Sequence, residues 1–392
     1  MAKAQRLACQ RVMTADGVLD DVVLELRDGR ITAITPGEAP AGAETVTGWV
    51  VPGFVDTHVH GGGGADYATT DRDEALRARD FHRRHGTTTS FASLVTADLD
   101  TIVAQVETLV PLVSSGDLAG IHLEGPFLSA ARCGAHDPSL LRAPEPASLD
   151  RLLEAGQGAI SMITIAPELP GALDAIERLT AAGVTAAVGH TDGDESIVAA
   201  ALDAGATVAT HLFNAMRPIH HREPGPIPRL LSDERVTVEL ICDGFHLHRD
   251  VIALAIAAAG PDRVALVTDA MVATGMSDGS YRLGSLEVRV DDGMARLVGE
   301  NGGIGSIAGS TLTMADAFAL VVRNGASIVD AATMAATTPA RRHELAAAPY
   351  GEDAAEDAVG EIRVGARADL CVVDEQGFLQ RVMQGGRWVD TT

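Results

Sequence analysis

The sequence predicts an α/β fold: a (β/α)8 TIM barrel with a small β-sandwich domain formed by both termini. Three observations predict it. Eight short apolar runs rich in β-branched residues recur along the chain, helical segments separate several of them, and the two ends of the chain carry hairpin patterns instead. Strands alternating with helices form βα units and a parallel sheet, and eight such units favour a barrel. A doubly wound open sheet would show the same periodicity.

The eight expected strands are short, and several of them end in polar residues. They cover Val50–Thr57, Thr87–Leu94, Ala119–Leu123, Ala159–Ala166, Val184–Gly189, Thr207–His211, Val236–Cys242 and Val264–Thr268. Helices are expected over Glu74–His85, over Leu99–Val113, over Glu195–Ala204 and near Met314–Val322. Asp194 is the expected N-cap of the third helix, which Gly205 ends.

Both ends of the chain contain short strands and turns. Asp28-Gly29 between Val22–Leu26 and Arg30–Ile34 is a hairpin signal. Near the other end, Leu370–Val373 and Phe378–Met383 are again short apolar runs separated by turn residues. We therefore expect residues 1–50 and 346–392 to form the small β-sandwich domain. Residues 51–345 then form the barrel domain, with a β excursion over Tyr281–Leu297. The acidic, alanine-rich stretch Ala346–Gly360 is expected to be an exposed linker or loop.

Composition excludes several classes of partner. The chain has 30 basic and 54 acidic residues and a formal charge of −24, which opposes binding to nucleic acid and to anionic membranes. No apolar run reaches the roughly 18 residues of a membrane helix, and the N-terminus lacks the apolar core of a signal peptide. The four cysteines (Cys9, Cys133, Cys242 and Cys371) are far apart, so we expect no disulfide framework and a cytoplasmic location.

Imidazole and carboxylate groups follow the expected strands. His58 and His60 point to the same side of an extended chain, at the end of a strand where barrel active sites lie. Four further candidate ligands occupy comparable positions: Glu124, His190, His211 and Asp269. A single histidine would more often be a hydrogen-bonded core residue, but a set at one rim favours one or two divalent metals per subunit. The donors suit zinc, with iron, manganese or cobalt as alternatives.

Asp269 is the carboxylate expected to act beside metal-activated water. It could orient or deprotonate that water and pass the proton to a leaving amine. The alternative is a purely structural carboxylate.

The ordered motifs resemble the amidohydrolase superfamily, and within it the family of N-acetylglucosamine-6-phosphate deacetylases. The matching stretches are Pro52–Gly61, His122–Phe127, Gly134–His136, Val188–Thr191, Thr210–Met216, Arg222–Gly225, Asp243–His246, Val267–Ala270 and Ala308–Met314. The resemblance implies hydrolysis of the N-acetyl group of N-acetyl-D-glucosamine 6-phosphate to D-glucosamine 6-phosphate and acetate, in amino-sugar catabolism and cell-wall recycling.

The resemblance also implies roles for individual residues. Glu124, His190 and His211 match a metal site found throughout the family, and His58 and His60 match a second site present in some members. Asp269 matches the catalytic acid/base, and His246 would donate to the developing oxyanion. The residues implied to contact substrate are Ala135, His136, Asn214, Ala215, Arg222, Asp243, Gly244, Phe245, His246, Ile307, Ala308 and Gly309. Arg222 would reach the phosphate in a neighbouring subunit, which implies a homodimer.

Some alternatives stay open at this point. An amidohydrolase could act on another amide, a cyclic imide or an aminopurine, and a non-catalytic scaffold could share the fold. Arg132-Cys133 stands where the family often has two basic residues, which is either neutral drift or a redox-sensitive lid. Arg217, His220 and His221 either add positive charge near the phosphate or lie on a surface loop.

Overall fold

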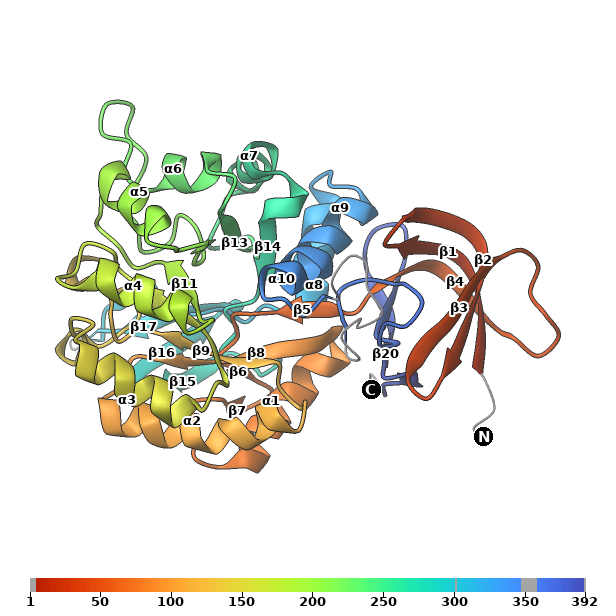
Figure 1. Ribbon diagram of the computed structural model, residues 1–392, viewed down its shortest axis with the longest axis horizontal. Coiled ribbons are helices and arrows are strands. Elements are labelled where there is room, and N and C mark those ends of the chain that lie inside the picture. The colour runs from red at the N-terminus through yellow and green to blue at the C-terminus, as the bar shows by residue number, and fades with distance from the viewer. Residues whose placement is uncertain (1–4, 300–301, 347–357, 391–392) are drawn as a thin grey trace. The chain divides into compact units, whose positions relative to one another are not determined.

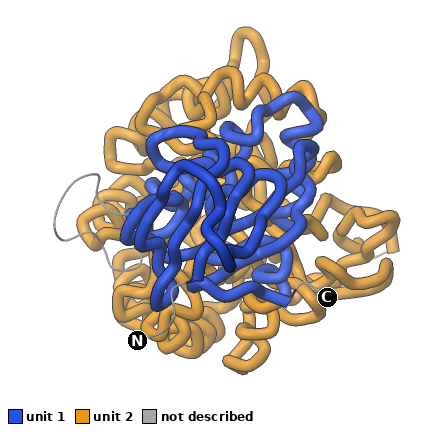
Figure 2. Tube along the Cα trace, turned by 90° about the vertical axis from the view of Figure 1, so that its right-hand side faces the viewer, with its two compact units in different colours: residues 1–56, 81–89, 313–392 blue, residues 57–80, 90–312 orange. Residues whose placement is uncertain are grey.

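The computed structural model describes residues 5–299, 302–346 and 358–390. The chain divides into two compact units, and each is continuous in space but not in sequence (Figure 2). One unit contains residues 1–56, 81–89 and 313–392, and the other contains residues 57–80 and 90–312. The domain boundaries inferred from the sequence stay a prediction. Most of the expected linker, residues 347–357, lies outside the described residues.

An eight-stranded parallel sheet carries the barrel, as the sequence predicts. Its order is β14-β13-β12-β11-β10-β9-β8-β5. The strands are β5 (Phe54–Asp56), β8 (Thr87–Val95), β9 (Gly120–Glu124), β10 (Ile160–Ile165), β11 (Thr185–Val188), β12 (Val208–Ala209), β13 (Thr237–Ile241) and β14 (Val264–Val267). Hydrogen bonds from Asp269 N–H to the His58 carbonyl and from His60 N–H to the Ala270 carbonyl, both 2.8 Å, join the segments that follow β14 and β5. These bonds connect the two ends of the strand order.

The first expected strand, Val50–Thr57, is in fact divided between two sheets. Residues up to Pro52 belong to β4 (Glu44–Pro52), which pairs with β1 and β19, whereas β5 begins at Phe54. Gly53 lies at the junction, where a Cβ atom would stand 2.2 Å from the Thr88 hydroxyl. Periodicity alone could not reveal this change of partner, because both pieces are apolar and buried.

Helices follow most of the strands along the chain, as the labels in Figure 1 show. They are α1 (Arg72–Arg84), α2 (Leu99–Ser114), α3 (Pro146–Gly156), α4 (Ala172–Ala181), α5 (Glu195–Asp203), α6 (Ile227–Ser232), α7 (Arg249–Ala259) and α8 (Met314–Arg323), then α9 (Ile328–Ala332), a π turn (Thr333–Thr337) and α10 (Thr338–Arg342). The expected cap of α5 is confirmed, because the Asp194 carboxylate accepts from the backbone N–H groups of Ser196 and Ile197.

The two ends of the chain share one seven-stranded sheet, in the order β21-β20-β19-β4-β1-β2-β3. Its remaining strands are β1 (Gln5–Thr14), β2 (Gly17–Arg27), β3 (Arg30–Pro36), β19 (Leu370–Val373), β20 (Leu379–Gln384) and β21 (Arg387–Trp388). Asp28 and Gly29 have positive φ angles of 51° and 80°, as the predicted hairpin turn requires. Leu7, Leu24 and Ile31 pack with Leu370 and Met383 in one core, which confirms that both termini build this sheet.

The expected β excursion is an antiparallel sheet of four strands. It contains β15 (Gly279–Leu283), β16 (Leu286–Asp291), β17 (Met294–Val298) and β18 (Ile304–Ile307). A two-stranded sheet, β6 (Gly61–Gly62) with β7 (Ala65–Asp66), follows β5. Val288 and Ala295 of the excursion pack against Met271, Ala273 and Val95. This packing brings the excursion to the segment that follows β14. Within the described ranges, no helix is long and apolar enough to cross a lipid bilayer.

Candidate active site

The candidate ligands lie at or just beyond the carboxyl ends of the barrel strands. Glu124 is the last residue of β9, and His190, His211 and Asp269 each stand two residues after β11, β12 and β14. These last three residues have positive φ angles of 48°, 26° and 49°. A left-handed backbone conformation at a non-glycine residue costs about 1–3 kcal/mol and persists where surrounding structure holds it, often at functional sites.

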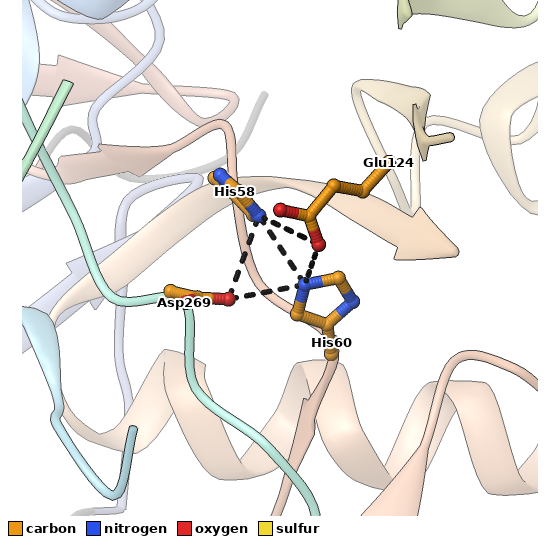
Figure 3. Close-up of side chains that lie close together, drawn as sticks. All are labelled: His58, His60, Glu124 and Asp269. Carbon is orange, nitrogen blue, oxygen red and sulfur yellow. Dashed lines mark hydrogen bonds and ion pairs between the residues drawn. The ribbon is translucent and has the colours of Figure 1, made fainter. Parts of the chain in front are cut away.

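The predicted ligands form two groups that share Glu124. The His58 group contains His58, His60, Glu124 and Asp269, and the His190 group contains Glu124, His190 and His211. Within each group one ligand atom from every residue lies within 4.8 Å of all the others, and every member is buried. Figure 3 shows the ring nitrogens and carboxylates of the His58 group pointing toward one another. The structure therefore brings all six predicted ligands together.

The His58 group presents electron-pair donors to a common centre. His60 Nδ1 donates to the Ser93 carbonyl at 3.2 Å, which leaves the lone pair of a neutral ring on Nε2. That Nε2 atom lies 3.2 Å from His58 Nε2 and 3.1 Å from oxygens of Glu124 and of Asp269. Neutral imidazoles and carboxylates at these distances repel one another unless a cation or protons lie between them.

The His190 group has the same character. The Arg132 carbonyl can only accept, so His190 carries a proton on Nδ1, at 2.9 Å from that oxygen. His190 Nε2 then faces His211 Nε2 at 3.1 Å and Glu124 Oε1 at 3.0 Å. His211 Nε2 lies 2.9 Å from the same oxygen. Both groups thus fit a divalent cation by geometry and by donor chemistry.

The pKa directions show the same demand for positive charge. Burial lowers the pKa of His60, but hydrogen bonds to Asp269 and Glu124 outweigh burial and raise it to about 9. Burial also lowers the pKa of His58, yet the charges of Glu124 and Asp269 hold it well above its usual range. Burial raises the pKa of Glu124, but the charges of His58 and His136 outweigh it and hold that pKa well below its usual range. The carboxylates of Glu124 and Asp269 therefore favour positive charge at this position.

Residues behind the ligands were not identified from the sequence. Glu239 of β13 lies 3.2 Å from His58 Nδ1 and 3.3 Å from the backbone nitrogen of His211. Ser93 Oγ accepts the Val59 backbone N–H at 2.9 Å and lies 3.0 Å from Nδ1 of His122. A signal for Glu239 existed, since it is the one charged residue within Val236–Cys242.

A cavity of about 460 Å³ opens onto the ligands. Of the residues expected to contact substrate, it is lined by Ala135, His136, Asn214, Ala215, His246, Ile307 and Gly309. Of the expected ligands it is lined by His60, Glu124, His190, His211 and Asp269, whereas His58 is fully buried behind them. Leu283 of β15 and Ser306 of β18 also line the cavity, and the sequence did not point to either of them.

Other expected residues lie outside this lining. Asp243 stands behind His246, with Oδ2 at 2.7 Å from His246 Nδ1. Ala308 is buried within the apolar cluster of the four-stranded sheet. Phe245 is 44% exposed and lines a separate hollow of β16–β18, and Gly244 lies beside it in the chain. Whether these residues contact substrate stays a prediction.

The basic residues near the rim have protein partners. Arg132 and Arg217 both pair with Asp192, at 2.8 and 3.0 Å. Arg222 is exposed, does not line the cavity, and lies with Nη1 at 2.7 Å from Nε2 of His221. Each of the four cysteines is free, and Cys133 lines the cavity.

Known proteins are similar to this chain over almost its whole length. The model of the amidohydrolase family matches residues 49–389. N-acetylgalactosamine-6-phosphate deacetylase of Escherichia coli O157:H7 is 35% identical over 387 residues, covering 97% of this chain and 98% of the relative. N-acetylglucosamine-6-phosphate deacetylase of Vibrio furnissii is 34% identical over 97% of this chain and 94% of the relative.

A similar solved structure is a mutant N-acetyl-D-glucosamine-6-phosphate deacetylase from Mycobacterium smegmatis in complex with N-acetyl-D-glucosamine-6-phosphate. It is 46% identical, has a TM-score of 0.92, and the match covers 99% of this chain and 100% of that one. The structure of N-acetylglucosamine-6-phosphate deacetylase from Thermotoga maritima has a TM-score of 0.85 at 29% identity, covering 98% and 99% of the two chains.

Proposed function

The chain belongs to the amidohydrolase family, and from this premise we propose that it hydrolyses the N-acetyl group of N-acetyl-D-glucosamine 6-phosphate. The products are D-glucosamine 6-phosphate and acetate. One observation carries the proposal: a single cavity is lined by members of both ligand groups, Asp269 among them, and by His246. This site belongs to a chain whose fold matches a deacetylase solved with that sugar phosphate.

The metal is proposed to be held by the His190 group and, as a second ion, by the His58 group. When bound, a divalent metal lowers the pKa of water toward about 7 and polarises the amide carbonyl. Imidazole and carboxylate ligands suit zinc first, with iron, manganese and cobalt as alternatives.

Asp269 is the proposed acid/base. Its carboxylate accepts the proton of the attacking water and delivers it to the amine nitrogen as the C–N bond breaks. Burial raises its pKa, but the charge of His58 and the hydrogen bond from His60 outweigh burial and lower that pKa, so the carboxylate is ionised and able to accept a proton.

His246 is proposed to donate to the oxygen that becomes negative in the transition state. The Asp243 carboxylate accepts from both the ring Nδ1–H and the backbone N–H of His246, so it fixes the ring against the cavity. Donation from the remaining nitrogen, Nε2, uses a ring that carries a proton on both nitrogens.

Substrate contacts are proposed for several residues in and around the cavity. His136 accepts the Thr96 backbone N–H on Nδ1 at 3.4 Å, so its ring proton lies on Nε2, 3.4 Å from Glu124 Oε2. We assign this N–H to a sugar hydroxyl. Asn214 and the Ala215 backbone are assigned to the phosphate, and Ile307–Gly309 to the face of the sugar. Arg222 is assigned to the phosphate in a neighbouring subunit, which its exposure and its absence from the cavity lining support.

The test is a deacetylation assay on metal-stripped protein with defined metal additions. The panel contains the 6-phosphates of N-acetylglucosamine, N-acetylgalactosamine and N-acetylmannosamine, together with unphosphorylated N-acetylglucosamine. We expect metal-dependent acetate release that is fastest with the first substrate. A higher kcat/KM for N-acetylgalactosamine 6-phosphate would instead favour the activity named for the Escherichia coli relative. If no substrate of the panel released acetate, the proposed function would be wrong.

A further inference from the structure

Glu239 is a buried carboxylate that reaches the active site only through other residues. It lies in the middle of β13, its exposed fraction is 1%, and it is not among the residues that line the cavity. An ionised carboxylate in such a position is costly unless hydrogen bonds satisfy it. Its partners therefore indicate why the residue is there.

One oxygen of Glu239 connects the two ligand groups. Oε2 lies 3.2 Å from His58 Nδ1 and 3.3 Å from the backbone nitrogen of His211. His58 belongs to the His58 group and His211 to the His190 group. The second oxygen, Oε1, lies 3.5 Å from the Thr57 hydroxyl.

The contact with His58 selects its tautomer. A carboxylate accepts, so the proton of a neutral His58 ring lies on Nδ1 and the lone pair on Nε2. Nε2 is the atom that faces Glu124 at 3.6 Å and Asp269 at 3.5 Å. A negative charge on the far side of the ring also makes Nε2 a stronger donor to a metal.

The contact with His211 supports a strained backbone. His211 has a φ angle of 26°, and β12 ends only two residues before it. Its N–H points to Glu239, and the next N–H, of Leu212, donates to the Glu239 carbonyl at 2.8 Å. The side chain and the backbone of one residue thus hold the turn that aims a ligand of the His190 group.

We propose that Glu239 is a positioning residue that sets the metal affinity of both ligand groups, through the ring of His58 and through the backbone of His211. Its acceptor oxygen serves both groups, whereas its charge serves mainly the His58 group. The inference rests on the proposed metal dependence and names a residue that touches neither the metal nor the substrate.

The test compares zinc binding in three variants and the wild type, by chelator competition on metal-stripped protein. Glu239→Gln keeps an acceptor oxygen and removes the charge, whereas Glu239→Leu removes both. Thr237→Val is the matched control. Thr237 is buried and lies two residues before Glu239 on the same strand, so its side chain points to the same side of the sheet. Circular dichroism and thermal melts establish that each variant is folded.

We expect Glu239→Gln to weaken zinc affinity at the His58 group about tenfold, and to change the affinity at the His190 group by less than about threefold. Glu239→Leu should weaken both zinc ions by about 10- to 100-fold, and Thr237→Val should change neither. The d–d spectrum of cobalt-substituted protein gives a second readout, since a ring in the wrong tautomer or a displaced backbone alters ligand geometry. If Glu239→Leu does not fold, Glu239→Gln carries the test.

Contrary outcomes are distinct from failure of the proposed function. Wild-type protein that binds no zinc contradicts the metal-dependent function itself. The role of the charge at the His58 group is overturned if the wild type binds only one zinc ion. It is also overturned if Glu239→Gln and the wild type bind zinc with equal affinities. A folded Glu239→Leu variant with wild-type affinities and an unchanged cobalt spectrum overturns the inference as a whole.

Discussion

Asp243 Oδ2 lies 2.7 Å from His246 Nδ1, and the other oxygen of this carboxylate accepts the backbone N–H of His246 at 2.8 Å. Burial raises the pKa of Asp243, but the hydrogen bond and charge of His246 outweigh burial and lower it. The aspartate is therefore ionised beside the imidazole. The form of the His246 ring that can donate to an oxyanion carries a proton on both nitrogens.

Replacing this carboxylate by an amide should mainly affect the chemical step. We expect Asp243→Asn to lower kcat by about 10- to 100-fold, less than the roughly 10²–10³ lost when an oxyanion donor is removed outright. KM should change by less than about threefold, because the amide still orients the ring. Steady-state kinetics check this, with the exposed Asp250→Asn as control. An increase in KM at unchanged kcat would instead make Asp243 a substrate-binding residue.

Asp269→Asn should abolish turnover without emptying the site. The amide retains an oxygen ligand but cannot carry a proton from water to the amine, so we expect kcat to fall by about 10²–10⁴-fold. Metal analysis of the purified variant should give a content near that of the wild type. Near-normal rates would refute the proposed acid/base, and loss of metal together with activity would make Asp269 chiefly a ligand.

Arg222→Gln should raise KM for the phosphorylated substrate by about tenfold or more and leave unphosphorylated N-acetylglucosamine unaffected. The reason is that a guanidinium binds phosphate through paired, charge-assisted hydrogen bonds. Steady-state kinetics on the two substrates separate these effects. An equal loss on both would show that Arg222 does not recognise phosphate.

Mixed oligomers test whether Arg222 acts across subunits. In this test, Arg222→Gln and Asp269→Asn chains with different affinity tags are co-expressed, and a heterodimer is isolated through both tags. If the arginine acts in the neighbouring site, the Arg222→Gln subunit keeps its own Asp269 and borrows an intact arginine. The heterodimer should then show a near wild-type KM at about half the wild-type kcat. The elevated KM of Arg222→Gln in the heterodimer would place the arginine in its own site.

Metal-stripped protein should lose stability as the pH rises from neutral to alkaline. The pKa of His60 is about 9 in the folded chain, against an ordinary value of 6.5. Because the folded value is the higher one, the stabilisation is complete below about pH 6.5 and is lost as the pH rises through about 9. Melting temperatures of stripped protein should fall over this window, and added zinc should raise them most at the alkaline end, where protons no longer compete for the ligands.

Two variants complete this pH experiment. His60→Gln should remove much of the fall in melting temperature with rising pH. His248 is exposed, so His248→Gln should leave that fall unchanged. A melting temperature of stripped wild-type protein that is constant between pH 6.5 and 9.5 would contradict the coupling of His60 to the two carboxylates.

Most of the barrel could be predicted because its strands carry their own signals. Short β-branched runs identified all eight strands, and the ligands followed from the rule that strand ends meet at one rim. The change of sheet at Gly53 could not be predicted, since the apolar pattern is continuous across Val50–Thr57. The partner of each half depends on segments far away in the chain.

The sequence identified the ligand residues because imidazole and carboxylate groups recur at the ends of strands. It did not identify residues that contact a ligand from the side away from the cavity. Glu239 lies within an apolar strand, and its importance depends on reaching His58 from another strand of the barrel. Leu283 and Ser306 reach the cavity because the four-stranded sheet packs on the segment after β14, a tertiary relationship that local patterns do not encode.

The seven-stranded sheet makes β4 wait for a partner that is synthesised about 300 residues later. β4 pairs with β19 through Pro52 opposite Leu370 and Trp49 opposite Val373, so one edge of β4 lacks its partner until β19 leaves the ribosome. A nascent chain exposes that unpaired edge while the whole barrel is being made. Chains that stop before β19 would therefore offer a strand edge able to pair with other chains, and such truncated products should aggregate or be degraded.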